Sequence, residues 1–256
     1  MVVNHRVPEG APPVIYTYPP TPQASLFFYI DDRLKVKKED EDEFITSPPS
    51  VIVGQQLKRV SIDINRSHRA VRVGFHPGGL YRLLGFSMSD TIDEHYAAED
   101  VFGKDIREVD ERLQSAKNND EIKNIVEAFL LKKARQVKTI LPFDMAMLEL
   151  LRQQGNLPVE QMASIACVSL RQFERLSKER IGLPPKLYAR IVRFSKAYRL
   201  REEFPEATWT QIAHQCGYFY QMHFIRDFKQ FAGITPRLAE KDLARQPVKM
   251  QIGLRL

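Results

Sequence analysis

The chain has 256 residues, of which 43% are hydrophobic and 27% are charged. This length exceeds that of one average domain, and the composition excludes a disordered chain, a membrane protein and, with two cysteines, a disulfide framework. Residues 1–135 contain 19 Lys and Arg against 21 Asp and Glu, a net charge of −2, whereas residues 136–256 contain 19 against 11, a net charge of +8. This asymmetry predicts a polyanion-binding module joined to a domain with a different task.

The N-terminal sequence predicts a protein that stays in the cytoplasm. Residues Met1–Pro8 lack the apolar core of a signal peptide. The longest apolar runs, such as Ser25–Ile30, are far shorter than the about 20 residues that span a bilayer. In that compartment we expect Cys167 and Cys216 to be reduced, buried thiols without a catalytic role, since no Cys-x-x-Cys spacing is present.

Residues 1–80 have the patterns of β-strands. Apolar runs that alternate with polar residues or are bounded by Pro and Gly predict a small antiparallel sheet or barrel. The predicted strands are Ser25–Ile30, Val51–Val53, Ser61–Asn65 and Val71–Phe75. The charged run Lys35–Glu43 lies between two of them, and its adjacent blocks of opposite charge are typical of a solvated hairpin or loop rather than of a ligand site.

From Lys104 onward the apolar period becomes that of an α-helix, which predicts two amphipathic helices within residues 104–135. Their apolar stripes consist of Ile106, Val109, Leu113 and Ala116, and of Ile122, Ile125, Val126, Phe129 and Leu130. The stripes either cover the sheet of their own domain or form the seam of a dimer, and burial within the chain is the commoner use. Pro142 and the change in charge place the domain boundary after residue 137.

The basic half contains an internal repeat. Gln161-Met162-Ala163 and Cys167-Val168 align with Gln211-Ile212-Ala213 and Gly217-Tyr218 at an offset of 50, and after a one-residue insertion the offset becomes 51. The further matches are Phe173 with Phe224, Arg175 with Arg226, Lys178 with Lys229, Gly182 with Gly233, Leu183 with Ile234 and Pro185 with Pro236. Each unit has the pattern of a helix-turn-helix, in which a small Ala on the first helix permits close crossing and a Gly ends the second helix.

The second helix of each unit, the candidate recognition helix, is predicted at Leu170–Ile181 and at Gln221–Phe231. Between the units, the apolar period predicts one connector helix over residues 186–204, about 28 Å long at 1.5 Å per residue. Such a connector can hold the two recognition helices about one turn of B-DNA, roughly 34 Å, apart. Its basic flank consists of Arg190, Arg193, Lys196, Arg199 and Arg201.

With this repeat, the C-terminal part of the chain resembles the DNA-binding domain of AraC-type bacterial transcriptional regulators. The similar segments are Ser169–Arg175 and Gly182–Tyr188 in the first unit, and Ile212–Tyr218, His223–Lys229 and Gly233–Pro236 in the second. The N-terminal part, mainly through Gly74-Phe75-His76-Pro77-Gly78-Gly79, resembles the β-rich domain that precedes this module in one subfamily.

The resemblance implies an α+β fold of two domains. Residues 1–137 are expected to form a cupin-like sensory or oligomerisation domain, in which a small antiparallel sheet or barrel is followed by two helices. Residues 138–245 are expected to form an all-α double helix-turn-helix domain with a long connector helix. Residues 246–256 are then a C-terminal tail.

Two positions depart from the pattern of that family. Tyr220 stands where the family usually has Asp or Ser, and it cannot cap the second recognition helix through a short side-chain oxygen as Ser169 can cap the first. Cys167 stands in the first turn where Gly is common. Neither change removes a residue from the outward face, so we expect them to alter affinity rather than function.

The resemblance implies a sequence-specific regulator that inserts both recognition helices into successive segments of the major groove. The residues expected to face base edges are Arg171, Glu174, Arg175, Met222, His223 and Arg226. Arg bonds bidentately to guanine, Glu accepts from cytosine N4, and Met contacts the methyl group of thymine. The residues expected to hold the DNA backbone, or to serve either purpose, are Ser169, Gln172, Lys178, Gln221 and Lys229.

Double-stranded DNA is the predicted partner, with RNA polymerase and an unknown small-molecule effector at the N-terminal domain as further candidates. We expect a monomer or homodimer that binds no membrane, uses no cofactor or metal and catalyses no reaction. One alternative is a dimerising adaptor with weakened DNA binding, which Tyr220 favours. The other is a cupin-like enzyme or metal protein, but His5, His68, His76 and His95 show no His-x-His or His-Glu-x-x-His spacing, and no phosphate loop or Gly-x-Ser-x-Gly elbow is present.

Overall fold

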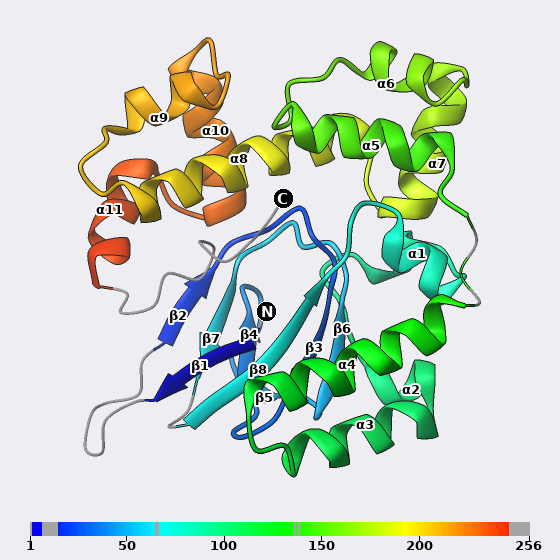
Figure 1. The fold of residues 1–256 in the computed structure, drawn as a ribbon. Helices are drawn as coiled ribbons and strands as arrows, with labels where there is room; N and C mark the ends of the chain where they lie inside the picture. The colour runs from blue at the N-terminus through cyan, green and yellow to red at the C-terminus, as the bar shows by residue number, and fades with distance from the viewer. Residues whose placement is uncertain (1, 7–14, 65–66, 136, 138, 246–256) are drawn as a thin grey trace.

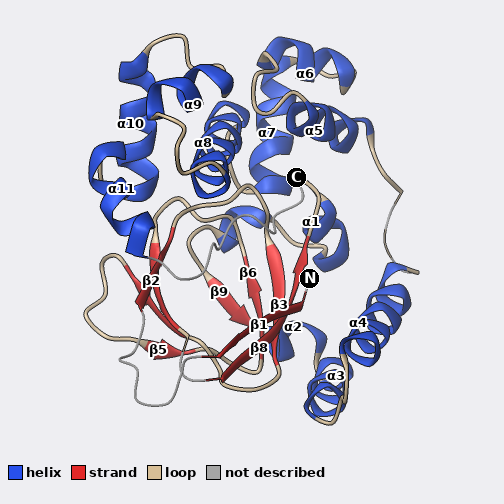
Figure 2. Cartoon of the chain, turned by 60° about the vertical axis from the view of Figure 1, so that its left-hand side comes forward, coloured by secondary structure: helices blue, strands red, loops and turns tan. Residues whose placement is uncertain are grey.

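The computed structural model describes residues 2–6, 15–64, 67–135, 137 and 139–245. These residues form a β-rich domain and a helical domain that lies over one end of the sheets (Figures 1 and 2). The predicted α+β fold of two domains is confirmed. The tail predicted at residues 246–256 lies outside the described residues.

Antiparallel strands form two sheets in the β-rich domain. The first has the order β1-β8-β3-β6-β9, with β1 (Val2–Arg6), β8 (Ser67–Gly74), β3 (Ser25–Tyr29), β6 (Ser50–Val53) and β9 (His95–Ala97). The second has the order β2-β7-β4-β5, with β2 (Ile15–Tyr18), β7 (Val60–Asp63), β4 (Lys35–Lys38) and β5 (Ile45–Thr46). The four predicted strands are β3, β6, β7 and β8, although Asn65 at the predicted end of β7 lies outside the described residues. The charged run is a hairpin, as predicted, because it begins in β4 and the chain returns antiparallel through β5.

The first sheet is covered by helices on one face and by the second sheet on the other. Since successive residues of a strand face opposite sides, Leu26 and Phe28 of β3 contact the helices, whereas Phe27 and Tyr29 contact the second sheet. The helices of this domain include α2 (Ala98–Phe102), α3 (Lys104–Gln114) and α4 (Asn119–Ala134). The predicted apolar stripes of α3 and α4 pack against the sheet of their own domain, so the expectation of burial within the chain is confirmed and a dimer seam along these stripes is wrong.

The C-terminal domain is built around the long helix α8. Its helices are α5 (Pro142–Arg152), α6 (Val159–Ile165), α7 (Leu170–Ile181), α8 (Pro185–Glu203), α9 (Trp209–Gln215), α10 (Gln221–Ala232) and α11 (Pro236–Arg245). Figure 1 shows α8 crossing the domain, with α6 and α7 at one end and α9 and α10 at the other. Both recognition helices and the connector lie within one residue of their predicted bounds. The short α1 (Gly79–Leu84) and the 3₁₀ turn η1 (Met88–Thr91) were not predicted, and they lie where the two domains meet.

The caps of the recognition helices follow the prediction. Gly182 and Gly233 end α7 and α10 in the left-handed conformation, with φ of 93° and 70°. The Ser169 hydroxyl accepts a hydrogen bond of 3.3 Å from the backbone N–H of Gln172 and so caps α7. Tyr220 makes no side-chain cap on α10. The second recognition helix therefore lacks the capping hydrogen bond that the first one has.

The two cysteines have different environments. Cys216 is buried as predicted, and burial raises the pKa of its thiol to about 11. Cys167 is exposed, so its predicted burial is wrong. The reason is that Cys167 occupies the surface turn before α7, where its φ is 54°, at the position that Gly217 occupies in the second unit with a φ of 80°.

Candidate nucleic-acid interface

The first recognition helix, α7, has one buried and one exposed face. Phe173 and Ile181 pack into the helical core, and the ring of Phe173 lies 5.1 Å from that of Phe143. The helical period then turns the polar residues of α7 toward solvent. The exposed residues are Arg171, Gln172, Glu174, Arg175 and Lys178, with Ser169 exposed at the N-cap.

The second recognition helix, α10, repeats this arrangement. Phe224, Phe228 and Phe231 are buried, while the ring of His223 lies at the surface, 5.6 Å from that of Tyr220. The exposed residues are Gln221, Met222, His223, Arg226 and Lys229. All residues predicted to contact bases or the DNA backbone are thus exposed on, or at the start of, one of two helices, and their contact with DNA stays a prediction.

Arg175 has a partner within α7. Its guanidinium pairs with Glu179 at 3.1 Å, and Glu179 accepts a hydrogen bond of 2.7 Å from the hydroxyl of Tyr81 in α1. The Arg175 side chain is 66% exposed. Exposed ion pairs contribute at most about 1 kcal/mol, so Arg175 can leave Glu179 for a base at little cost.

The β-rich domain contacts the C-terminal half of α7 and leaves its first turns uncovered. The Ser89 hydroxyl in η1 donates a hydrogen bond of 2.9 Å to the backbone carbonyl of Lys178. Gly182 fits this contact because a Cβ there would lie 2.7 Å from the carbonyl oxygen of Met88. In helix-turn-helix proteins the N-terminal residues of the recognition helix contact base edges. The docking of the two domains therefore leaves the candidate face of α7 accessible.

The basic flank predicted on the connector is used inside the domain instead of forming a free surface. Arg190 in α8 donates hydrogen bonds of 3.0 and 2.7 Å to Asp227 in α10, which is only 2% exposed and also accepts the Tyr218 hydroxyl at 3.3 Å. Three further cations donate hydrogen bonds to backbone carbonyls: Arg193 to Gly155, Lys196 to Gln215 and Arg201 to Ala207. These cations hold the two helix-turn-helix units onto α8, so the predicted basic flank is engaged within the domain.

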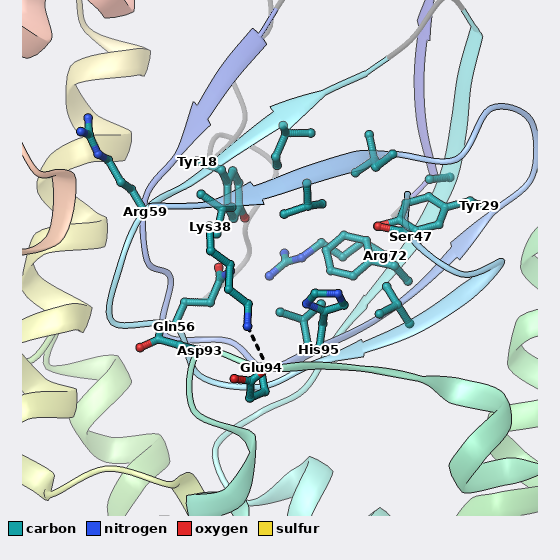
Figure 3. A pocket seen from close by; sticks show the side chains of 18 of the residues that line it. Tyr18, Tyr29, Lys38, Ser47, Gln56, Arg59, Arg72, Asp93, Glu94 and His95 are labelled. Carbon is teal, nitrogen blue, oxygen red and sulfur yellow. Dashed lines mark hydrogen bonds and ion pairs between the residues drawn. The ribbon is translucent and has the colours of Figure 1, made fainter. Parts of the chain in front are cut away.

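A cavity of about 680 Å³ lies between the two sheets of the β-rich domain (Figure 3). Its walls are mainly apolar. Arg72 from β8 projects into it, with its guanidinium 5.8 Å from the ring of Phe27. Lys38 and Glu94 form an ion pair of 2.8 Å at its edge. Burial, together with the nearby Lys38, lowers the pKa of His95 in the same wall.

The sequence patterns did not predict this cavity. The charged run was expected to be unrelated to a ligand site, but Lys38, Glu39, Asp40 and Glu41 line the cavity. Arg72 was not singled out either. The alternation of side chains along β8 could have indicated that Arg72 points inward. Arg72 lies on the same face of the strand as His68 and Ala70, whereas Val71 lies on the other face.

The described residues contain no group of three or more His, Cys, Asp or Glu that could hold a metal ion. His68 is buried with its ring 5.9 Å from that of Tyr29, and His76 is exposed. The side chain of His5 lies outside the described residues. Within the described part of the chain, no helix is long and apolar enough to cross a membrane.

The helical domain has relatives among known proteins. Residues 162–241 match the family described as a helix-turn-helix domain. The HTH-type transcriptional regulator ArgR of Pseudomonas aeruginosa is 31% identical over 81 residues, which cover 32% of this chain and 24% of ArgR. An uncharacterized HTH-type transcriptional regulator of Haemophilus influenzae is 25% identical over 151 residues, which cover 52% of this chain and 50% of that protein. The chain thus spans half or less of the length of these relatives.

The fold of both domains is similar to that of ToxT from Vibrio cholerae. An apo ToxT structure aligns with a TM-score of 0.52 and 14% identity over 95% of this chain and 97% of ToxT. ToxT bound to an unsaturated fatty acid aligns with a TM-score of 0.51 and 14% identity, over 97% and 96% of the two chains. The molecule is a β-rich domain joined to a double helix-turn-helix domain. The latter contains a helix-turn-helix domain at residues 162–241, as the predicted resemblance implies.

Proposed function

We propose that the protein is a sequence-specific DNA-binding transcriptional regulator of the AraC type. The observation that carries this proposal is the exposure of polar and basic residues on both α7 and α10, the two recognition helices of one repeat, at opposite ends of α8. The helix-turn-helix family match and the two regulators among the relatives support the same function. In this proposal α7 and α10 enter successive segments of the major groove.

Equivalent residues of the two units have equivalent roles. Arg175 and Arg226 bond to the O6 and N7 atoms of guanine. The other base contacts are assigned to Arg171, Glu174, Met222 and His223. Lys178 and Lys229 hold phosphates, together with Ser169, whose hydroxyl can still donate while its oxygen caps α7. Gln172 and Gln221 serve either purpose.

The experiment uses the full chain and a duplex site selected from a random pool. Arg175→Ala and Arg226→Ala should each weaken binding to that site by about 5- to 150-fold, equivalent to about 1–3 kcal/mol, and relax the preference for one base pair. Fluorescence anisotropy measures the affinity of each variant for the selected site and for the site with that base pair changed. Lys123→Ala, at an exposed position of α4 in the other domain, is the matched control and should bind like the wild type. Full discrimination in both Arg variants would contradict the assignment.

The cavity of the β-rich domain supports a second part of the proposal, a small effector with an apolar body and a carboxylate. Its volume of about 680 Å³ lies within the roughly 300–1,000 Å³ of small-molecule sites. The apolar walls suit the body, while Arg72 and Lys38 are cations that pair with a carboxylate. ToxT, which has the same fold, has been solved with an unsaturated fatty acid bound, and this supports the same ligand class.

Titration calorimetry with a monounsaturated long-chain fatty acid tests this part. The full chain should bind it, and Arg72→Gln should weaken binding by about tenfold or more, because charge-assisted hydrogen bonds contribute about 1.5–3 kcal/mol. Lys123→Ala again serves as the control. Equal binding by Arg72→Gln would contradict the role of Arg72, and no heat with the wild type would contradict the ligand class.

The remaining expectations are part of the same proposal. The protein acts in the cytoplasm as a monomer or homodimer, catalyses no reaction and engages RNA polymerase at its target. Sedimentation of the full chain with and without its selected duplex measures the oligomeric state and the stoichiometry. A dimerising adaptor without DNA binding would sediment identically in both samples.

A further inference from the structure

Three large apolar side chains lie exposed where α10 begins. Phe219 is 94% exposed, Tyr220 is 69% exposed and Met222 is 74% exposed. We call these three residues the aromatic edge. Side chains of this size usually gain stability by burial, and the phenylalanines further along α10 are buried. Folding of the domain therefore does not explain why these side chains are apolar.

The repeat shows that the first unit has no counterpart of the aromatic edge. The two units align at an offset of 50 up to Val168 and Tyr218 and at an offset of 51 from Ser169 and Tyr220 onward, so Phe219 is the inserted residue. The backbone supports this alignment, because Val168 N–H bonds to the carbonyl of Ala163 at 3.1 Å and Tyr218 N–H to that of Ala213 at 3.0 Å. The second unit thus has an exposed Phe without a counterpart in the first unit, and an exposed Tyr at the position of the capping Ser.

This replacement costs helix stability. Ser169 accepts a hydrogen bond from a backbone N–H in the first turn of α7, whereas Tyr220 makes no such bond to α10. An exposed aromatic residue that does not cap its helix lowers the stability of the isolated protein relative to a capping Ser. Contact between the ring and a bound molecule would offset this cost.

The surroundings of the aromatic edge favour DNA as that molecule. The N-terminal end of a recognition helix is the part that approaches base edges. His223, Arg226 and Lys229 are exposed on the same helix, and Asp227, its single acidic residue, is buried against Arg190. The exposed face of α10 therefore combines cations with apolar rings and presents no carboxylate, which suits a polyanion that also offers apolar groups. In the major groove, that apolar group is the C5 methyl of thymine.

We propose that Phe219 and Tyr220, together with Met222, contact thymine methyl groups in the half-site of the second unit and make this unit selective for thymine. The proposal rests on the proposed function, because it assumes that α10 enters the major groove. It adds a specificity element that the first unit lacks, since Ser169 stands at the position of Tyr220. The first unit then selects its bases mainly by hydrogen bonds, and the second also by apolar contact.

The experiment replaces the thymines of the selected duplex site, one at a time, by deoxyuridine, which lacks the C5 methyl and keeps the hydrogen-bonding groups. At one or two neighbouring positions in one half-site, the full chain should bind about 3- to 10-fold more weakly, as expected for the loss of one or two buried methyl groups. The double variant Phe219→Ser/Tyr220→Ser should bind the thymine site at least as weakly as the wild type binds the deoxyuridine site. Its preference for thymine over deoxyuridine should shrink, because only Met222 then contacts a methyl group.

Thermal unfolding separates this effect from a folding defect. Tyr220→Ser introduces a capping residue, so its melting temperature should equal or exceed that of the wild type while its DNA affinity falls. Phe204→Ser, at a 51% exposed aromatic residue outside the recognition helices, is the matched control and should leave affinity unchanged.

The outcomes distinguish this inference from the proposed function. If Arg226→Ala weakens binding but deoxyuridine has no effect, or if the double variant binds like the wild type, the aromatic edge does not read thymine and the inference is overturned while the regulator stands. If the double variant keeps the full deoxyuridine effect, other residues contact the methyl groups, which also overturns it. If no duplex is selected at all, the proposed function itself fails.

Discussion

At the scale of single residues, the turn before α7 holds backbone strain. Cys167 has a φ of 54°, and Gly217 at the equivalent place in the second unit has a φ of 80°. The left-handed conformation costs a residue with a Cβ roughly 1–2 kcal/mol, whereas glycine adopts it freely. The turn before α7 therefore has the same left-handed backbone conformation as the turn before α10, but at a cost in stability.

Replacing Cys167 by glycine should remove this strain. Cys167→Gly should raise the free energy of unfolding by up to about 1 kcal/mol, since the strain relieved exceeds the chain entropy that glycine adds to the unfolded state. Urea denaturation measures the change. Cys167→Ala removes the thiol but keeps the Cβ, so it should bring no gain. A gain of the same size in the alanine variant would show that the thiol, and not the backbone, is responsible.

At the scale of helices and strands, the local sequence pattern predicted those helices that have a clear apolar period and defined ends. α7, α8 and α10 were predicted within one residue because each has a sustained apolar period and a Gly or Pro at its ends. The strands β1, β2 and β9 were not predicted because they span only 3 to 5 residues and show no apolar period. Helix α5 was also not predicted, although its buried residues from Phe143 to Leu151 form a helical stripe. The pairing of Arg190 with Asp227 joins residues far apart in the sequence, so no local pattern reveals it.

The ion pair between Arg190 and Asp227 should be a main attachment of α10 to α8. Asp227→Ala should lower the free energy of unfolding by about 3 kcal/mol, because Arg190 would lose its buried partner. In the first unit the equivalent position of Asp227 is Leu176. The double variant Arg190→Leu/Asp227→Leu should accordingly recover much of the loss in urea denaturation. A single variant as stable as the control Glu160→Ala, at an exposed position of α6, would contradict this role.

Helix α3 carries a carboxyl group whose ionisation opposes folding. Burial raises the pKa of Asp110 to about 6, although a hydrogen bond of 2.8 Å from the Ser50 hydroxyl favours its charged form. An Asp in the unfolded chain has a pKa near 3.9. The folded state thus binds more protons between these two values, and the free energy of unfolding falls as pH rises from about 4 to 6.

Asp110→Asn should remove this pH dependence while keeping an acceptor for Ser50. At pH 7 the variant should be about 1–2 kcal/mol more stable than the wild type, after allowance for solvent screening, and at pH 4 the two should be equal. Urea denaturation at both pH values measures the difference, with Glu108→Gln at an exposed position of α3 as the control. A difference that is the same at pH 4 and pH 7 would mean that the ionisation of Asp110 is not its cause.

At the scale of the whole molecule, contacts between the two domains determine how the helical domain docks, which local sequence patterns did not predict. Arg82 in α1 lies 3.6 Å from Asp144 in α5, which is 1% exposed, and the Tyr188 hydroxyl of α8 donates a hydrogen bond of 2.8 Å to the carbonyl of Pro22. Such contacts dock the helical domain on the β-rich one with the first turns of α7 and α10 turned outward. The cavity around Arg72 likewise forms only when two sheets meet. Charge asymmetry and the repeat predicted a DNA-binding module, but its docking depends on residues that are distant in the chain.

The central claim is that α7 and α10 read one DNA site together. Selection of duplexes from a random pool by the full chain, followed by sequencing, tests it most directly. Because α8 is about 28 Å long at 1.5 Å per residue, the bound sites should share two short blocks whose centres lie about 10 base pairs apart. A pool without enrichment, or one that converges on a single block, would contradict a regulator that uses both recognition helices.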